Sequence, residues 1–136
     1  MQMRFALMGV LACCGYSPVL LAQDATKVDS KHYSVVSENA QVRILRAHYG
    51  PHEKSIMHSH PATVAVFLSD GKGKFTFPDG KTQDFAGKLG DVMYSAATTH
   101  LPENTGDQPF DVIVVELKGK AAKAAKAAKP ADAAAK

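Results

Sequence analysis

His58 and His60 are separated by one residue. They stand directly before an apolar run at residues 62–68 that is typical of a β-strand. Side chains alternate across a strand, so the two imidazoles are expected on one face. A third histidine, His100, follows a second apolar segment at residues 91–94. Neutral imidazoles bind Fe, Mn, Zn, Ni and Cu ions. We therefore predict that His58, His60 and His100 bind one divalent transition metal, whose identity the sequence leaves open.

The segments that must position these histidines have the pattern of short β-strands. They are rich in β-branched and aromatic residues, are bounded by Gly, Pro, Asp or Asn, and cover residues 32–36, 41–49, 62–68, 74–77, 82–85 and 110–117. Turns are predicted at residues 70–73 and 78–81. No helix of note is expected before residue 119. Some large side chains are expected to fill the interior, namely Phe75, Phe77, Met93 and Tyr94. The pattern predicts an all-β barrel or sandwich.

The chain has 136 residues, enough for one domain, which we place at residues 33–118. Residues 23–118 carry ten Lys and Arg against twelve Asp and Glu, a net charge of −2. The overall charge of +3 therefore comes from the two ends of the chain. A mildly acidic domain argues against a specific nucleic-acid partner.

Residues 1–22 are predicted to be a signal peptide, because Arg4 precedes an apolar run that ends in Ala22 before polar residues. This predicts a periplasmic or secreted protein. Two alternatives are a single membrane anchor and a lipoprotein attached at Cys13. Cys13 and Cys14 are the only cysteines, so a chain cleaved after Ala22 has neither a disulfide nor a cysteine nucleophile.

Residues 119–136 form a Lys/Ala-rich low-complexity tail. Its lysines recur every third residue and spread around a helix rather than forming one stripe, and Pro130 interrupts any helix. Such a segment has little apolar surface to bury. It is interpreted either as a solvated, inert tail or as a polycation that contacts anionic envelope surfaces.

The histidine pair and its surroundings resemble the first motif of the cupin superfamily of small β-barrels. In that motif a glycine precedes His-x-His, and a glutamate and a second glycine follow it. Gly71 stands at the closing glycine, which puts Val64 at the glutamate position and His52 at the opening glycine.

A second cupin motif is similar to residues 90–104, where His100 and Asn104 keep the His-x-x-x-Asn spacing. The internal Pro and Gly of that motif are absent. The resemblance covers nearly all of residues 33–118. It implies a single cupin-type β-barrel (a double-stranded β-helix, or jelly roll) that forms a homodimer.

The loss of the cupin glutamate would change the metal site. Apolar Val64 cannot be a ligand, so the site would have three histidines and open positions, and a divalent ion would keep its full +2 charge. His52 or Glu53 could supply a fourth ligand from the preceding loop, although a loop residue without that role is the simpler interpretation. Glu103 is expected to face away from His100, because it has the opposite parity.

Three functions from different classes are consistent with these features. The first is an exported metal-dependent cupin enzyme, an oxygenase or isomerase, acting on a small oxygen-rich or anionic molecule. The second is a non-catalytic cupin that binds such a molecule. The third is an envelope-associated scaffold with a polycationic tail. Bound metal would separate the first two from the third, and turnover would separate the first from the second.

Overall fold

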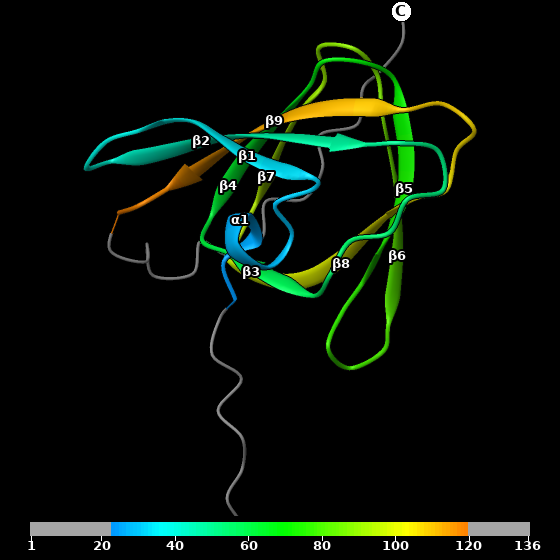
Figure 1. The fold of residues 1–136 in the computed structure, drawn as a ribbon, viewed down its shortest axis with the longest axis horizontal. Coiled ribbons are helices and arrows are strands. Elements are labelled where there is room, and N and C mark those ends of the chain that lie inside the picture. The colour runs from blue at the N-terminus through cyan, green and yellow to red at the C-terminus, as the bar shows by residue number, and fades with distance from the viewer. Residues whose placement is uncertain (1–22, 120–136) are drawn as a thin grey trace, which may run out of the picture.

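The computed structural model describes residues 23–119, which form two antiparallel sheets around a common interior (Figure 1). The strands are β1 (Tyr33–Glu38), β2 (Val42–Tyr49), β3 (His58–His60), β4 (Thr63–Phe67), β5 (Gly71–Thr76), β6 (Thr82–Gly87), β7 (Val92–Ser95), β8 (Thr98–Asn104) and β9 (Phe110–Leu117). One short helix, α1 (Ala25–Val28), precedes them. The predicted all-β architecture is confirmed.

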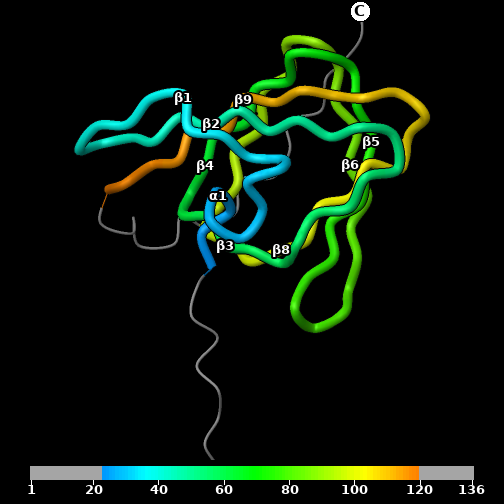
Figure 2. The backbone as a smooth tube through the Cα atoms, viewed as in Figure 1, coloured from blue at the N-terminus to red at the C-terminus, as the bar shows by residue number. Residues whose placement is uncertain are grey.

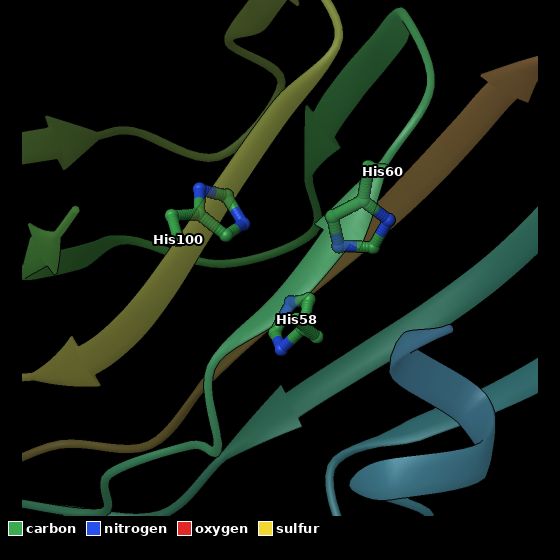
Figure 3. Close-up of side chains that lie close together, drawn as sticks. All are labelled: His58, His60 and His100. Atoms are coloured by element: carbon green, nitrogen blue, oxygen red, sulfur yellow. The ribbon is translucent and has the colours of Figure 1, made fainter. Parts of the chain in front are cut away.

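One sheet has the order β1-β2-β9-β4-β7 and the other the order β3-β8-β5-β6. The backbone runs around the shared interior from one sheet to the other (Figure 2). β3 and β8 are neighbours in the smaller sheet and carry the three candidate ligands (Figure 3). The sequence therefore folds so that residues from two distant segments meet on one inner wall.

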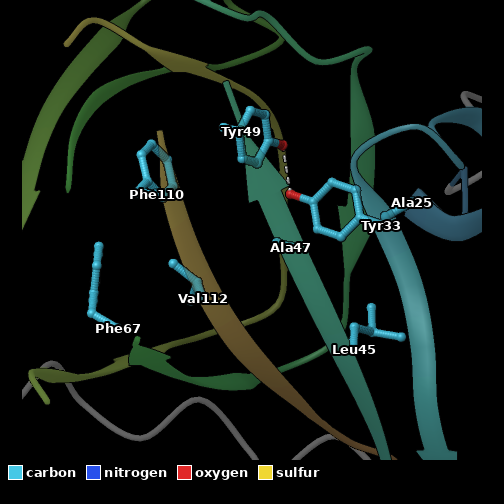
Figure 4. Packing of buried hydrophobic residues seen from close by; sticks show 8 residues of the cluster. All are labelled: Ala25, Tyr33, Leu45, Ala47, Tyr49, Phe67, Phe110 and Val112. Carbon is cyan, nitrogen blue, oxygen red and sulfur yellow. Dashed lines mark hydrogen bonds between the residues drawn. The ribbon is translucent and has the colours of Figure 1, made fainter. Parts of the chain in front are cut away.

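The core lies between the sheets, and its buried apolar residues come from α1 and from strands β1, β2, β4 and β9 of the larger sheet. Leu45, Ala47 and Tyr49 on β2 are buried, whereas Arg46 and His48 between them are exposed. Tyr33 and Tyr49 meet in the interior, where their hydroxyl groups share a hydrogen bond of 2.9 Å (Figure 4). The other buried apolar residues are Ala25, Phe67, Phe110 and Val112.

The turns agree with the prediction at residues 78–81 and differ at residues 70–73. Gly80 has a φ of 81°, in the left-handed region that favours glycine, and closes the hairpin between β5 and β6. Gly71 instead begins β5, because its missing side chain makes room for a ring: a Cβ atom there would lie 2.7 Å from Phe110. This glycine serves close packing in the strand rather than a turn.

Residues 23–32 pack on the barrel, although the expected domain began at residue 33. Asp24 caps α1 by accepting a hydrogen bond from the Thr26 amide, and Ala25 is fully buried. The Gln23 carbonyl accepts a hydrogen bond of 2.7 Å from the Ser59 amide, between the two histidines of β3. The N-terminal segment is thus part of the folded unit.

The predicted signal peptide with Cys13, and the predicted tail from residue 120 onward, lie outside the described residues. Within residues 23–119, no helix has the length and apolar character needed to cross a membrane.

Candidate metal centre

His58, His60 and His100 come together inside the barrel. In the antiparallel pair of β3 and β8, His58 lies opposite His100 and His60 lies opposite Thr98. One ring nitrogen of each histidine lies within 4.8 Å of those of the other two. Figure 3 shows the three rings converging from the two strands. The structure thus brings together the three residues that the sequence singled out.

Hydrogen bonds orient two of the rings. His58 Nδ1 donates to the Ile56 carbonyl at 2.7 Å, and His60 Nδ1 donates to the buried Glu116 carboxylate at 2.7 Å. Each bond occupies Nδ1 and leaves Nε2 as the nitrogen with a free lone pair. Such outer contacts fix the tautomer of histidines that bind metals.

Two ring nitrogens have no partner within the described part of the chain. His58 Nε2 and His100 Nε2 are buried and make no hydrogen bond there. An unsatisfied buried polar atom costs about 1–3 kcal/mol, so two in one cluster need a physical reason. A metal ion bound to both atoms would supply it, and the residues therefore fit the ion that the sequence predicted.

The environment keeps two of these imidazoles neutral. Burial, with a contribution from nearby His60, lowers the pKa of His58 to about 4. Burial, with contributions from the other two histidines, lowers the pKa of His100 to about 3. A neutral imidazole has the lone pair that a metal requires, so these ligands are ready at neutral pH.

A chain of charged groups supports His60 from the far side of the ring. Glu116 on β9 bonds to His60 and accepts a hydrogen bond of 2.5 Å from Arg43 Nε, and Arg43 also donates to Asp24 at 2.6 Å. Burial acts to raise the pKa of Glu116, but the bonds to His60 and Arg43 outweigh it and hold the pKa below its usual value. An ionised Glu116 strengthens His60 as a donor to metal.

A second polar cluster lies beside His58 and includes residues that sequence reasoning missed. Ser55 Oγ donates to buried Asp29 and lies 3.4 Å from His58 Nδ1. Asp29 also accepts a hydrogen bond of 2.8 Å from His32 Nδ1, and the His32 ring stacks on Tyr49 at 4.5 Å. The three-residue spacing of Asp29 and His32 was the one available signal, and it lay before residue 33, where the predicted domain begins.

The structure does not bring the two loop candidates for a fourth ligand, His52 and Glu53, to the cluster. His52 has a φ of 57°, is largely exposed, and bonds through Nε2 to Asp107 at 2.8 Å. Glu53 binds Lys31, His32 and the Gly50 amide. Neither side chain is available to the three-histidine cluster, because each is held by its own partners.

Val64, the position inferred for the missing carboxylate, does not face the histidines. Thr63, Ala65 and Phe67 of β4 line the barrel interior, so Val64 lies on the outer face of the sheet. Its neighbours across the strand pairs are Tyr94 and Val115. The inner position nearest to that prediction is Ala65, which cannot be a ligand either.

Other predicted roles are settled by contacts. Asn104 holds a turn and is not part of the histidine cluster: its side chain accepts a hydrogen bond from the Gly106 amide and donates one to the Gln108 carbonyl. Glu103 faces away from the cluster and lies near Lys74. Tyr94 was expected in the interior but is 62% exposed, because it shares the outer face of the sheet.

A cavity of about 80 Å³ lies beside His60 and His100. Phe75 forms one wall and stacks on the His100 ring, with centroids 4.7 Å apart. The other lining residues include the buried rings of Tyr49 and Phe110, both visible in Figure 4. The cavity gives a small molecule room next to the proposed metal ligands.

Solved structures share this fold. A cupin domain from Bordetella pertussis Tohama I superposes with a TM-score of 0.59 at 20% identity, covering 64% of this chain and 92% of that one. A conserved protein with a double-stranded β-helix domain from Klebsiella pneumoniae gives 0.51 at 23% identity, covering 66% and 78%. An RmlC-like cupin family protein from Methanocaldococcus jannaschii gives 0.51 at 15% identity, covering 62% and 77%.

No family model matches the sequence, and no curated protein is significantly similar to it. The structural likeness shows the fold: this is a cupin-type β-barrel, a double-stranded β-helix, as the resemblance implied. Within that barrel, the three histidines form a cluster that could hold a metal ion.

Proposed function

We propose that this protein is a metal-binding cupin in which His58, His60 and His100 hold one divalent transition metal. The observation that carries the proposal is the pair of buried Nε2 atoms, on His58 and His100, that lack partners among the described residues. When bound, such an ion polarises a small molecule that binds to it. The chain supplies three neutral donors, and Glu116 and Ile56 fix two of the rings.

The ligand of this centre is a small molecule that binds in the cavity beside His60 and His100. No lysine, arginine, aspartate or glutamate lines the cavity within residues 23–119. The tyrosines there, Tyr33 and Tyr49, have pKa values raised chiefly by burial, so they stay protonated. The cavity thus lacks an evident acid or base. This favours a cupin that binds its ligand without catalysis over an oxygenase or isomerase.

The test is metal content. We expect the purified protein, loaded with each candidate metal and desalted, to retain about one ion per chain by elemental analysis. Replacing His58, His60 or His100 with Ala should lower that value sharply. His52→Ala is the control, because His52 bonds to Asp107 at the surface. A wild-type protein that retains no divalent metal at neutral pH would refute the proposal.

Export to the periplasm or the medium is part of the proposal and rests on the sequence of residues 1–22. Intact-mass measurement on cell fractions tests it. A chain beginning at or near Gln23 is expected, a lipid-modified start at Cys13 would establish the lipoprotein alternative, and an unprocessed cytoplasmic chain would refute export. Contact of the tail with anionic envelope surfaces is tested by salt-sensitive binding to anionic vesicles.

We also propose a homodimer through the outer face of the larger sheet. Val92 and Tyr94, on the same face of β7, are 65% and 62% exposed and form part of an exposed apolar patch. Further apolar side chains on the same face are Ile44, Val64, Val66, Ile113 and Val115. Sedimentation equilibrium should give a dimer for the wild type and a monomer for Tyr94→Lys. A monomeric wild type would refute this assembly.

A further inference from the structure

The cavity beside the histidines has walls made almost wholly of hydrocarbon. Aromatic rings, two aliphatic side chains, a thioether and a proline form most of its surface: Phe67, Phe75, Phe85, Phe110, Val112, Val114, Met93 and Pro102. Its polar side chains, apart from the imidazoles, carry only hydroxyl groups. The hydroxyls of Tyr33 and Tyr49 already bond to each other.

These walls exclude a ligand with several polar groups. Each hydroxyl or carboxylate that loses water without gaining a partner weakens binding. Besides the tyrosine pair, the cavity offers only the hydroxyl groups of Thr63, Ser95 and Thr98, and no amide, amine or carboxylate side chain, to replace those hydration bonds. A sugar or a multiply charged acid therefore does not match the cavity. The class of ligand is smaller than the oxygen-rich or anionic molecules expected from the sequence.

The charge at one end of the cavity determines the head group of the ligand. Three neutral imidazoles leave a divalent ion with its +2 charge, and nearby Glu116 is already neutralised by Arg43. One anionic donor group bound at the ion is thus favoured. The remainder of the ligand must be apolar, because it contacts the phenylalanine rings.

Size limits the apolar part. A cavity of about 150 Å³ lined by apolar side chains is large enough for benzene. The cavity here, at about 80 Å³, is about half that volume. Two of its lining residues on β7, Met93 and Ser95, are themselves exposed, so we place its entrance beside them. A body of about three or four carbon atoms therefore fits, with entry beside β7.

We infer that the metal centre takes a short amphiphile: one anionic donor group on the ion and an unbranched hydrocarbon body of about three or four carbons in the phenylalanine-lined cavity. This inference rests on the proposed metal site and goes further by naming the class of ligand. The carbon body supplies affinity by leaving water, and the single donor group sets its orientation.

The probes are sodium formate, acetate, propionate, butyrate and hexanoate, titrated by calorimetry into metal-loaded protein of verified stoichiometry. Affinity should rise about fourfold for each added methylene up to butyrate, as expected for burial of a CH₂ group. It should fall at hexanoate, which exceeds the cavity. 4-Hydroxybutyrate, which matches butyrate in carbon number but carries a hydroxyl at the end that enters the cavity, should bind at least tenfold more weakly than butyrate.

Two neighbouring residues on opposite faces of β4 provide matched variants. Ala65→Leu fills the cavity and should abolish the gain with chain length, whereas Val64→Leu on the outer face should bind like the wild type. Met93→Ala enlarges the cavity at its exposed mouth and should move the optimum to a longer acid, and it tests the idea even if Ala65→Leu does not fold.

Three outcomes overturn the inference: affinities that are equal across the acids, 4-hydroxybutyrate binding as well as butyrate, or an Ala65→Leu variant with an unchanged length profile. Each would leave the metal site intact, since stoichiometry is measured first. Loss of metal by the wild-type protein would instead refute the proposed function, and the ligand class with it.

Discussion

Glu116 is the residue whose replacement best tests how the metal centre is supported. Its side chain is 3% exposed and connects His60 to Arg43. Glu116→Gln keeps the shape but removes the charge that holds the His60 Nδ1 proton. We expect weaker metal binding, because a neutral amide polarises the imidazole less than a carboxylate does.

The size of the effect follows from general values for outer contacts of metal ligands. Losing such a partner lowers metal affinity by about 10- to 100-fold. At a metal concentration about 100 times the wild-type Kd, bound metal stabilises the wild type by about 2.7 kcal/mol. If Kd rises about 30-fold, the same concentration stabilises the variant by only about 0.9 kcal/mol. For a domain of this size, the metal-induced rise in Tm should therefore be roughly 10 °C smaller for Glu116→Gln than for the wild type.

The assay is thermal unfolding at a series of metal concentrations, with and without a chelator. Metal-free Glu116→Gln should itself be less stable by about 1–3 kcal/mol, because Arg43 keeps Asp24 but loses one charged partner. Glu103→Gln is the matched control, since Glu103 faces away from the histidines and lies near Lys54 and Lys74. If Glu116→Gln shows the wild-type rise in Tm at every metal concentration, Glu116 does not support the centre.

Three further outcomes are expected. The metal-free folded protein has pKa values of about 4 for His58 and about 3 for His100, below the ordinary 6.5. The unfolded chain therefore binds more protons as the pH falls below about 6.5, and urea titrations should show the free energy of unfolding decreasing from there toward pH 4. Ala65→Glu should tighten metal binding by adding an inner carboxylate, whereas Val64→Glu, on the outer face, should leave the measured Kd unchanged. Gly71→Ala should destabilise the fold by about 1–3 kcal/mol in chemical denaturation, because the new Cβ atom clashes with a core ring.

The barrel and its three histidines could be predicted because they depend on local patterns. The strand period places His58 and His60 on one face, and two strand segments suffice to bring in His100. The face of β4 on which Val64 lies could not be predicted. The chain turns between His60 and β4, and one residue more or fewer in that turn would move every following side chain to the other face of the strand.

The outer contacts of the histidines lay beyond sequence reasoning for a different reason. Asp29 and Glu116 reach the site from segments far from β3 in the sequence, and neither segment has a pattern that indicates a role in chemistry. His52 was considered as a fourth ligand because it closely precedes the His-x-His pair, but its backbone turns the side chain to the surface, where it bonds to Asp107. Partnerships between residues distant in the chain become visible only in three dimensions.

The hydrogen bonds around β3 also bear on the order of folding and metal uptake. Glu116 is 56 residues beyond His60 and 73 beyond Arg43, while Gln23 from the other end of the domain pairs with Ser59. Contacts between such distant residues form late and slow the folding reaction, because long loops must close first. His60 therefore lacks its carboxylate partner until the last strand, β9, has joined the sheet. We expect the chain to gain its full affinity for metal only when folding is complete, so that metal uptake in a refolding experiment reports the final step rather than an early one.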